Sequence, residues 1–523
     1  MSAAMKILLT YISGESCRDN PYINLVPAGL CYLHSTLREA GFDAVLANFS
    51  GWSDAAISRE VKKLQPRIAA ISQWTHNRHA SSSLASLIRK LHPTCLILMG
   101  GAHASFRSRH LLKQESAVDA VVVGEGEETL LELAERISTG LDWRDVKGLA
   151  CRKGNSIVTT PPRPALRNLD SLPFPALHLQ KHSLGIDHTL QAEFVITARG
   201  CPSACSFCSS PNFWNRKVRF RSPQNVVDEI IFLRDTFGLI YFSIRDDTFT
   251  ADRSRAIEIC RLLIERRVFV VWNCQSRVTA IDAELLLWMK RAGCEGIQLG
   301  VESGSPRILR MLEKSITPAQ VEHASQLVKH AGINLSVYLI SDVPGETEED
   351  ISATIQLMHR IRPDDGYVSP LAYFPGTLLF EKAVAEGRIA DDVFEACRES
   401  AIYAVQKQGK ASRRLLKSIS GDGGGDKGDC RQIRKRMGYC YVANVVAGER
   451  FHQQGDDLSA EREYREIVEL EADNPWGWYL LGELYRELGD RGRSQNCYRK
   501  VLSLVPNHFP SLDMLQNKKK RDR

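Results

Sequence analysis

The chain has 523 residues, 43% hydrophobic and 25% charged, which is typical of a globular protein with room for about three domains. It has neither an apolar run near the ~18–20 residues of a membrane helix nor a secretory signal, so we expect a cytoplasmic protein without a membrane span. The net charge of +6 comes from residues 409–437 and 518–523, which leaves the remainder mildly acidic, and we expect no nucleic-acid partner.

Five short apolar runs alternate with stretches of helical spacing in residues 1–140. The runs are 6–12, 44–47, 68–72, 96–101 and 120–124, and the helical stretches are 28–40, 53–64, 79–91 and 127–138. Strands buried on both faces and alternating with helices predict a doubly wound parallel sheet. A ligand on such a sheet binds at the carboxyl ends of the strands, here Ser72, Gly100, Gly101 and Gly124. The proline-rich residues 141–190 predict a connector that contains a hairpin-like piece.

A cysteine-rich loop, residues 199–208, follows the apolar run Phe194–Thr197. Cys201, Cys205 and Cys208 have the spacing C-x3-C-x2-C and could bind three irons of a [4Fe–4S] cluster, leaving the fourth iron open. A zinc loop and three unrelated cysteines are the alternatives. Structural zinc usually takes four ligands in two pairs, and no C-x2-C partner follows downstream.

Residues 191–400 repeat a strand-then-helix pattern about six times. After the first strand, the strand candidates are 240–245, 269–273, 296–301, 335–340 and 367–372, and the helical stretches between them are 223–236, 252–265, 282–291, 318–331 and 347–361. Six such units predict a partial (β/α)6 barrel with its active site at the carboxyl ends of the strands. The cysteine loop lies at that end.

The cysteine loop, with Phe207 before the third cysteine, resembles the signature of the radical S-adenosylmethionine (SAM) superfamily. The resemblance implies that the open iron binds the amino and carboxylate groups of SAM, and that one electron splits SAM to a 5′-deoxyadenosyl radical. It also implies an electron donor such as flavodoxin or ferredoxin. Only Cys397, Cys430, Cys440 and Cys497 follow the barrel, too dispersed for an auxiliary cluster, so we expect one cluster.

The same resemblance implies a SAM-binding role for polar and aromatic residues at the other strand ends. Asp246 and Asp247 would bind the SAM amino group, Arg277 its carboxylate, Glu302 with Ser303 the ribose, and Tyr373 the adenine. A surface ion pair or a helix cap is the alternative for each residue alone. The family's usual glycine in the fifth-strand motif is replaced by Ser341-Asp342-Val343.

The N-terminal third of the chain resembles the cobalamin (vitamin B12)-binding domain, here residues 1–140, that precedes the barrel in one class of radical SAM proteins. The resemblance rests on the stretches 27–33, 37–41, 100–105, 123–129 and 169–175. The mutase-type loop that supplies a histidine to cobalt is absent, because residues 13–20 contain no histidine. We therefore expect cobalamin to bind without a histidine from that loop, and we interpret His103 as a loop residue.

The resemblances together imply a cobalamin-dependent methyltransferase that acts on an unactivated carbon. The alternatives are a cyclase or oxidoreductase of the same class, an enzyme whose first domain is empty, and a non-catalytic adaptor. The sequence assigns no catalytic residue beyond the cofactor ligands, and the substrate, a small molecule or a peptide, is not specified.

The C-terminal part begins with a basic segment, 401–437, that predicts a flexible linker. In residues 438–515, Gly455, Tyr464 and Leu470 recur 34 residues later, and Trp478-x-x-Leu481-Gly482-x-x-Tyr485 matches a tetratricopeptide repeat. Because two repeats are marginal alone, we expect them to pack on the barrel, pair with themselves or bind a protein partner. Residues 516–523 form a basic tail.

Overall fold

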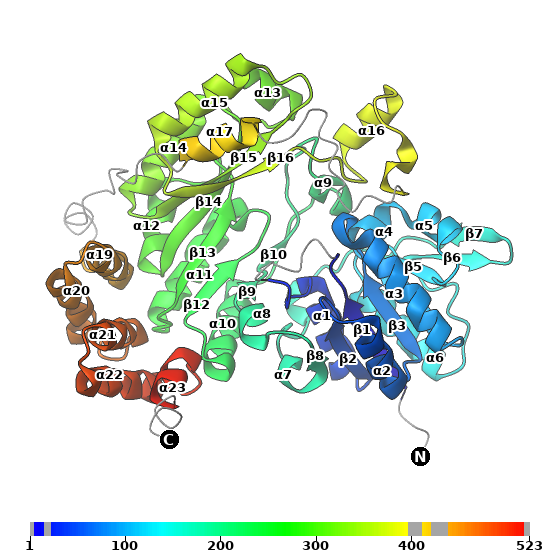
Figure 1. Ribbon diagram of the computed structural model, residues 1–523, viewed down its shortest axis with the longest axis horizontal. Helices are drawn as coiled ribbons and strands as arrows, with labels where there is room; N and C mark the ends of the chain where they lie inside the picture. The colour runs from blue at the N-terminus through cyan, green and yellow to red at the C-terminus, as the bar shows by residue number, and fades with distance from the viewer. Residues whose placement is uncertain (1–4, 15–21, 396–409, 420–437, 517–523) are drawn as a thin grey trace. The chain divides into compact units, whose positions relative to one another are not determined.

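The computed structural model describes residues 5–14, 22–395, 410–419 and 438–516. They form two units, each with its own sheet of wholly or mainly parallel strands (Figure 1). Unit 1 contains the described residues of Met1–Gln191, Ser203–Arg219 and Ala372–Tyr403, and unit 2 contains those of Ala192–Pro202, Phe220–Leu371 and Ala404–Arg523.

Unit 1 is built on an eight-stranded sheet of order β7-β6-β5-β4-β3-β1-β2-β8. The strands are β1 (Lys6–Tyr11), β2 (Asp43–Asn48), β3 (Ile68–Ser72), β4 (Leu96–Gly100), β5 (Ala120–Val122), β6 (Leu149–Lys153), β7 (Ser156–Thr159) and β8 (Ser183–Leu184). The five central strands are parallel, with β1 between β3 and β2, and β6 and β7 add antiparallel pairs at one edge. The segment assigned from sequence to a connector therefore supplies three strands.

Helices cover both faces of this sheet (Figure 1, blue to cyan). The helices α1 (Ala28–Glu39) and α6 (Glu127–Ser138) contact each other on one face. The other face packs against α2 (Asp54–Leu64), α3 (Arg78–Leu91) and α5 (Ser108–Gln114), which bury residues such as Ile57, Leu84 and Leu111 with the strands. The predicted doubly wound sheet is confirmed, and its topological switch point lies between β1 and β3.

Unit 2 is built on a six-stranded parallel sheet of order β16-β15-β14-β13-β12-β9, which confirms the partial barrel. The strands are β9 (Phe194–Val195), β12 (Tyr241–Ile244), β13 (Val271–Ser276), β14 (Cys294–Glu302), β15 (Asn334–Ser341) and β16 (Asp365–Pro370). The main helices between them are α10 (Pro223–Phe237), α11 (Arg253–Glu265), α12 (Ala283–Arg291), α14 (Pro318–His330) and α15 (Glu348–Ile361). Ser222, Asp282 and Thr317 cap α10, α12 and α14, as their sequence positions predict.

One helix lies within the predicted linker. Residues 401–409 and 420–437 fall outside the described residues, but α17 (Lys410–Ile419) contacts β16 and α15. Leu415 and Ile419 are buried there. This helix therefore packs against the last elements of the barrel, α15, β15 and β16.

The C-terminal repeats fold as antiparallel helices. These are α19 (Tyr441–Gln453), α20 (Asp457–Leu470), α21 (Pro475–Glu487), α22 (Arg491–Leu504) and α23 (Phe509–Gln516). A Cβ at Gly448 would overlap the ring of Tyr464, and one at Gly482 would overlap that of Tyr498, so the same glycine–tyrosine contact occurs in both repeats. The tail after residue 516 lies outside the described residues.

The repeats pack against the barrel in one hydrophobic core, which includes Ile240, Phe269 and Val271. The Tyr441 hydroxyl donates to the Val270 carbonyl at 2.7 Å, and Arg267 pairs with Asp473 at 2.5 Å. Both barrel residues precede β13, so the repeats cover the amino ends of the strands. That is the end opposite to where a barrel places its active site.

Lys290, on α12 near this packing, is 1% exposed, and its Nζ has no hydrogen-bond partner among the described residues. Burial lowers the pKa of Lys290. We expect Lys290→Met to raise the free energy of unfolding by about 1–3 kcal/mol at pH 7, because it removes a buried, unpaired polar group. The exposed Lys500→Met is the control and should change it by less than about 0.5 kcal/mol.

The gain from Lys290→Met should depend on pH. Since the folded protein holds Lys290 with a lowered pKa, the unfolded chain binds its proton more tightly, and wild-type stability rises with pH up to about 10.4. The advantage of the variant should therefore shrink as pH rises. Thermal unfolding of both full-length proteins between pH 7 and 10 measures this, and an equal or lower stability of the variant at pH 7 would contradict the prediction.

None of the helices in the described part of the chain has the length and apolar character needed to cross a membrane.

Candidate active site

The three motif cysteines follow the short strand β10 (Ala198–Arg199). None forms a disulfide; Cys205 is buried, and Cys201 and Cys208 are half-buried. The division between the units falls after Pro202, so Cys201 belongs to unit 2 and the other two to unit 1. In unit 1 the Cys208 amide donates to the Cys205 carbonyl at 3.2 Å, and in unit 2 Cys201 Sγ lies 3.8 Å from Thr248 Oγ1.

Across the described residues, no three His, Cys, Asp or Glu side chains form a group that could hold a single metal ion. A [4Fe–4S] cluster makes a different demand, because each cysteine binds its own iron. Three cysteines on one loop, none of them in a disulfide, offer three thiol donors of the kind that binds such a cluster.

Asp246, directly after β12, fixes the chain that leads to Cys201. Its Oδ1 accepts from the amides of Thr197 and Ala198 at 2.6 and 3.0 Å, and its Oδ2 accepts from the Thr197 hydroxyl. The residue is 1% exposed; burial raises the pKa of Asp246, and these hydrogen bonds oppose the rise. Arg255 adds a bond to the Thr197 carbonyl at 2.7 Å. Both carboxylate oxygens are therefore used within the protein.

The other predicted SAM residues near β12 and β13 follow the carboxyl ends of these strands. Asp247 is exposed next to Asp246, and Arg277 is half-buried directly after β13. Arg245, beside them, stacks on Phe194 with its guanidinium carbon 5.2 Å from the ring centre.

Glu302 ends β14 in a left-handed conformation, with φ +65°. The pairing of β14 with β15 shifts register between Gly300 and Glu302, which marks a β-bulge, a feature that often re-aims a side chain beside an active site. Glu302 is 5% exposed and pairs with Lys314 at 2.7 Å. Ser303, also buried, lies 3.1 Å from Thr354 Oγ1 on α15.

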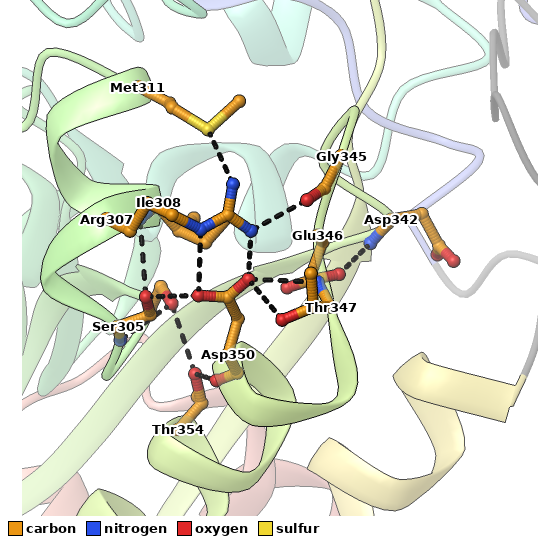
Figure 2. A network of polar contacts seen from close by, with 11 residues as sticks. Ser305, Arg307, Ile308, Met311, Asp342, Gly345, Glu346, Thr347, Asp350 and Thr354 are labelled. Atoms are coloured by element: carbon orange, nitrogen blue, oxygen red, sulfur yellow. Dashed lines mark hydrogen bonds and ion pairs between the residues drawn. The ribbon is translucent and has the colours of Figure 1, made fainter.

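A polar network links the loops that follow β14 and β15 (Figure 2). Asp350, on α15, accepts from Ser305 Oγ at 2.5 Å, from the Thr347 amide at 2.9 Å and from Arg307. Arg307 also donates to the Gly345 carbonyl at 2.7 Å. Burial alone would raise the pKa of Asp350, but the bonds from Arg307, Ser305 and Thr347 outweigh it and lower the pKa. The network holds the backbone after Glu302 against the turn at Gly345.

The fifth strand shows how this chain accommodates the missing glycine. Asp342 adopts φ +60°, a conformation that favours glycine. Its amide donates to Glu346 at 2.9 Å, and its Oδ2 accepts from Ser341 Oγ at 2.8 Å (Figure 2 shows the Glu346 contact). Burial raises the pKa of Glu346 to about 7. These local hydrogen bonds stabilise an aspartate where only glycine would be unstrained.

Two predicted cofactor residues belong to unit 1. Tyr373 is 2% exposed and packs with Phe380, Ala383 and Phe394. Phe207 is half-buried beside Cys208. These two rings thus belong to a different unit from the predicted SAM residues Asp246, Asp247, Arg277, Glu302 and Ser303.

The residues predicted to bind cobalamin lie at the carboxyl ends of β3, β4 and β5. Ser72 ends β3 and pairs in register with Gly100. Gly101 has φ +97°, and a Cβ there would lie 2.7 Å from the Gln73 carbonyl oxygen. Gly124 has φ +81° and faces open space. After β4 and β5, the backbone at Gly101 and Gly124 is therefore not covered by a side chain of its own.

Asn77, which the sequence analysis did not identify, joins the chain segments at the ends of β1 and β3, on either side of the switch point. Its side chain is 0% exposed and donates to the carbonyls of Ile12, directly after β1, and Ser72, the last residue of β3, at 2.8 and 3.1 Å. Trp74, in the same loop, is 40% exposed. The histidine-free loop 13–20 lies mostly outside the described residues, which resume at residue 22.

His103 lies in the short helix α4 (Ala102–Phe106) rather than in a loop. It is buried, and its Nδ1 lies 3.1 Å from Thr75 Oγ1. Burial, together with Arg78 and Arg107, lowers the pKa of His103 to about 3. This histidine is neutral and paired inside unit 1.

Sequence reasoning missed Lys314, Asn77 and Asp350. Thr347-x-x-Asp350 is a capping-box pattern and could have identified Asp350 as the cap of α15. The contacts of Lys314 and Asn77 are tertiary, and no local pattern indicates them.

Family models match three parts of the chain: the Radical SAM superfamily over residues 195–358, a B12 binding domain over 19–134 and a Tetratricopeptide repeat over 475–508. An uncharacterized methyltransferase of Pyrococcus horikoshii is 32% identical over 362 residues, covering 69% of this chain and 78% of that protein. An anaerobic magnesium-protoporphyrin IX monomethyl ester cyclase of Cereibacter sphaeroides is 31% identical over 392 residues, covering 73% of this chain and 63% of that protein.

The fold resembles that of the radical SAM methyltransferase TsrM of Kitasatospora setae, solved with cobalamin and a [4Fe-4S] cluster. The TM-score is 0.62 at 19% identity, over 73% of this chain and 78% of TsrM. The matches to the three family models and to the methyltransferase of P. horikoshii confirm the resemblances drawn from the motifs. The chain belongs to the radical SAM superfamily of enzymes, with a B12 binding domain ahead of its barrel.

Proposed function

We propose that this enzyme cleaves SAM reductively at a [4Fe–4S] cluster and transfers a methyl group to an unactivated carbon with the help of cobalamin. The C-x3-C-x2-C loop carries the proposal, because three thiols at that spacing after the first barrel strand suit a cluster with one open iron. Cys201, Cys205 and Cys208 would each bind one iron. When bound, the cluster supplies the electron that breaks the S–C5′ bond of SAM.

The residues at the strand ends suit the polar groups of SAM. Asp247 would accept from its amino group and Arg277 would pair with its carboxylate, while Asp246 would support the cysteine loop instead of binding SAM. Glu302 and Ser303 would face the ribose. The buried Oε2 of Glu302 has no partner among the described residues, as expected for an atom that awaits a hydroxyl donor.

Two aromatic residues complete the SAM assignment. Tyr373 would stack on the adenine, and Phe207 would flank the cluster, both by their place in the family pattern. An alanine at either position tests the assignment through the affinity for SAM.

Cobalamin would bind at the carboxyl ends of β3, β4 and β5, on Ser72, Gly100, Gly101 and Gly124. The switch point of a doubly wound sheet is where such folds bind ligands. The bare backbone at Gly101 and Gly124 suits a large flat ring, and cobalamin supplies a carrier for the methyl group. His103, neutral and paired with Thr75, is a structural residue and not a cobalt ligand.

We expect Gly101→Ala to weaken hydroxocobalamin binding by at least about tenfold, since its Cβ would displace Gln73 and the loop that carries Trp74. Gly140→Ala is the matched control: Gly140 also has a positive φ, +75°, but a Cβ there contacts nothing. Equilibrium dialysis of the full-length protein measures both. Micromolar binding supports the proposal, and no binding by wild type would remove cobalamin and methyl transfer from it.

A cyclase is the second candidate, since a cyclase and a methyltransferase match this chain at almost equal identity. Product analysis with SAM labelled in its methyl group separates them. Label in the product supports methyl transfer, and an unlabelled cyclised product supports the alternative.

The substrate would be a small molecule or a peptide, and the electron donor a flavodoxin or ferredoxin. The repeats indicate protein interaction, and we propose a protein partner on the surface that the barrel leaves uncovered. We also propose a cytoplasmic location, since a reducing compartment suits the free cysteines of the described residues.

A further inference from the structure

Lys314 forms a buried ion pair that the family pattern does not account for. It lies in the loop between α13 (Pro306–Met311) and α14, where its amide donates to the Leu309 carbonyl at 2.9 Å. Its side chain is 7% exposed, and its Nζ donates to Glu302 Oε1 at 2.7 Å. A lysine is rarely buried this deeply unless it is paired.

The pair uses only one oxygen of the carboxylate. Glu302 Oε2 is buried and has no hydrogen-bond partner among the described residues. A buried carboxylate oxygen without a donor is costly, and no described residue supplies a donor here, so this oxygen suits a ligand that donates a hydrogen bond.

The backbone leaves room for this arrangement. A Cβ at Gly300 would lie 2.8 Å from both Glu302 Oε1 and Lys314 Nζ. The β-bulge and the positive φ of Glu302 follow directly after this glycine. The missing side chain at Gly300, the β-bulge and the positive φ of Glu302 together orient one carboxylate. An exposed ion pair would require none of these features.

We propose that Lys314 is a positioning residue, which holds Glu302 by Oε1 so that Oε2 accepts a hydrogen bond from a ribose hydroxyl of SAM. This inference rests on the proposed function. Lys314 itself does not touch the nucleoside in this account. Replacing Lys314 should therefore weaken the binding of SAM but not of an analogue that lacks the contacted ribose hydroxyl.

The test compares the dissociation constants of SAM and of its 2′-deoxy and 3′-deoxy analogues, measured by equilibrium dialysis on the anaerobically reconstituted full chain. We expect Lys314→Met to weaken SAM binding by about 10- to 100-fold, the value of a hydrogen bond to a charged group. For the analogue that lacks the contacted hydroxyl, wild type and variant should agree within about twofold.

Three further variants sharpen the test. Lys314→Arg should recover part of the affinity because it keeps the charge. Gly300→Ala should weaken SAM binding because its Cβ displaces the pair. Lys290→Met, which removes another buried lysine of unit 2 from near the amino ends of the strands, should leave the dissociation constant of SAM unchanged.

Equal losses for SAM and both analogues would show a purely structural ion pair and overturn the assignment of Lys314 while leaving the proposed function intact. An unchanged affinity of Lys314→Met for SAM would overturn it as well. If wild type with a full cluster binds no SAM, the proposed function and this inference both fail. Should Lys314→Met not fold, Lys314→Arg and Gly300→Ala give the same comparison.

Discussion

Replacing any one of Cys201, Cys205 and Cys208 with alanine is expected to reduce cluster-bound iron and the formation of 5′-deoxyadenosine to background. A cube held by three thiolates loses one of its three protein ligands in each variant, and iron–sulfur clusters depend on such ligation. Iron and sulfide analysis after anaerobic reconstitution, together with the visible absorbance of the cluster, measures the first effect. Product analysis after adding SAM and a reductant measures the second.

The matched control for the cysteines is Cys95→Ala. Like Cys205, Cys95 is buried in unit 1, but it lies in the hydrophobic core that includes α3, far along the chain from the motif. It should keep wild-type iron content and lose only the packing of one small apolar side chain. Wild-type iron in a variant of any motif cysteine would contradict its assignment as a ligand.

Replacing Asp246 with alanine is expected to lower the free energy of unfolding by about 3–5 kcal/mol and to impair cluster retention. The substitution leaves the buried amides of Thr197 and Ala198 and the Thr197 hydroxyl without their acceptor. Unsatisfied buried donors cost about 1–3 kcal/mol each. Because the loop can relax, we expect the loss of stability to be smaller than the full sum of the three penalties. Chemical unfolding and iron content after reconstitution measure the two effects.

Asp246→Asn separates charge from shape. One oxygen remains an acceptor, so we expect a smaller loss of stability than for alanine. The exposed Asp235→Asn, whose carboxylate pairs only with Arg234 among the described contacts, should change stability by less than about 0.5 kcal/mol. A variant of Asp246 as stable as this control would show that the three hydrogen bonds do not fix the loop.

Much of the fold could be predicted because buried parallel strands appear as apolar runs. The run 68–72 coincides with β3, and the helix over 127–138 coincides with α6. Helix starts such as Ser222 were visible because a cap depends on the residue itself and its near neighbours. The bounds of the apolar runs gave the strand ends, and most residues proposed to bind a cofactor were chosen at those ends.

The remaining features arise from tertiary contacts. Nothing local to Lys314 indicates that it meets Glu302, twelve residues earlier. The use of both Asp246 oxygens by Thr197 and Ala198 depends on how β9 and β12 pair. Similarly, the left-handed Asp342 is stabilised by Glu346 and Ser341, so a pattern that expects glycine there cannot reveal how an aspartate is accommodated.

The repeats show the same limit. Their 34-residue period predicted helical hairpins, and the structure adds that Tyr441 and Asp473 bind the amino ends of the barrel strands. Burial of α19 against the barrel depends on side chains from both partners. Sequence periodicity alone could not choose this surface.

Reductive cleavage of SAM by the anaerobically reconstituted full-length protein tests the central claim most directly. With dithionite or a flavodoxin system as reductant, the account predicts about four irons per chain and the formation of 5′-deoxyadenosine and methionine from SAM. A protein that holds its full complement of iron yet produces no 5′-deoxyadenosine with either reductant, or one that retains no iron at all, would contradict it.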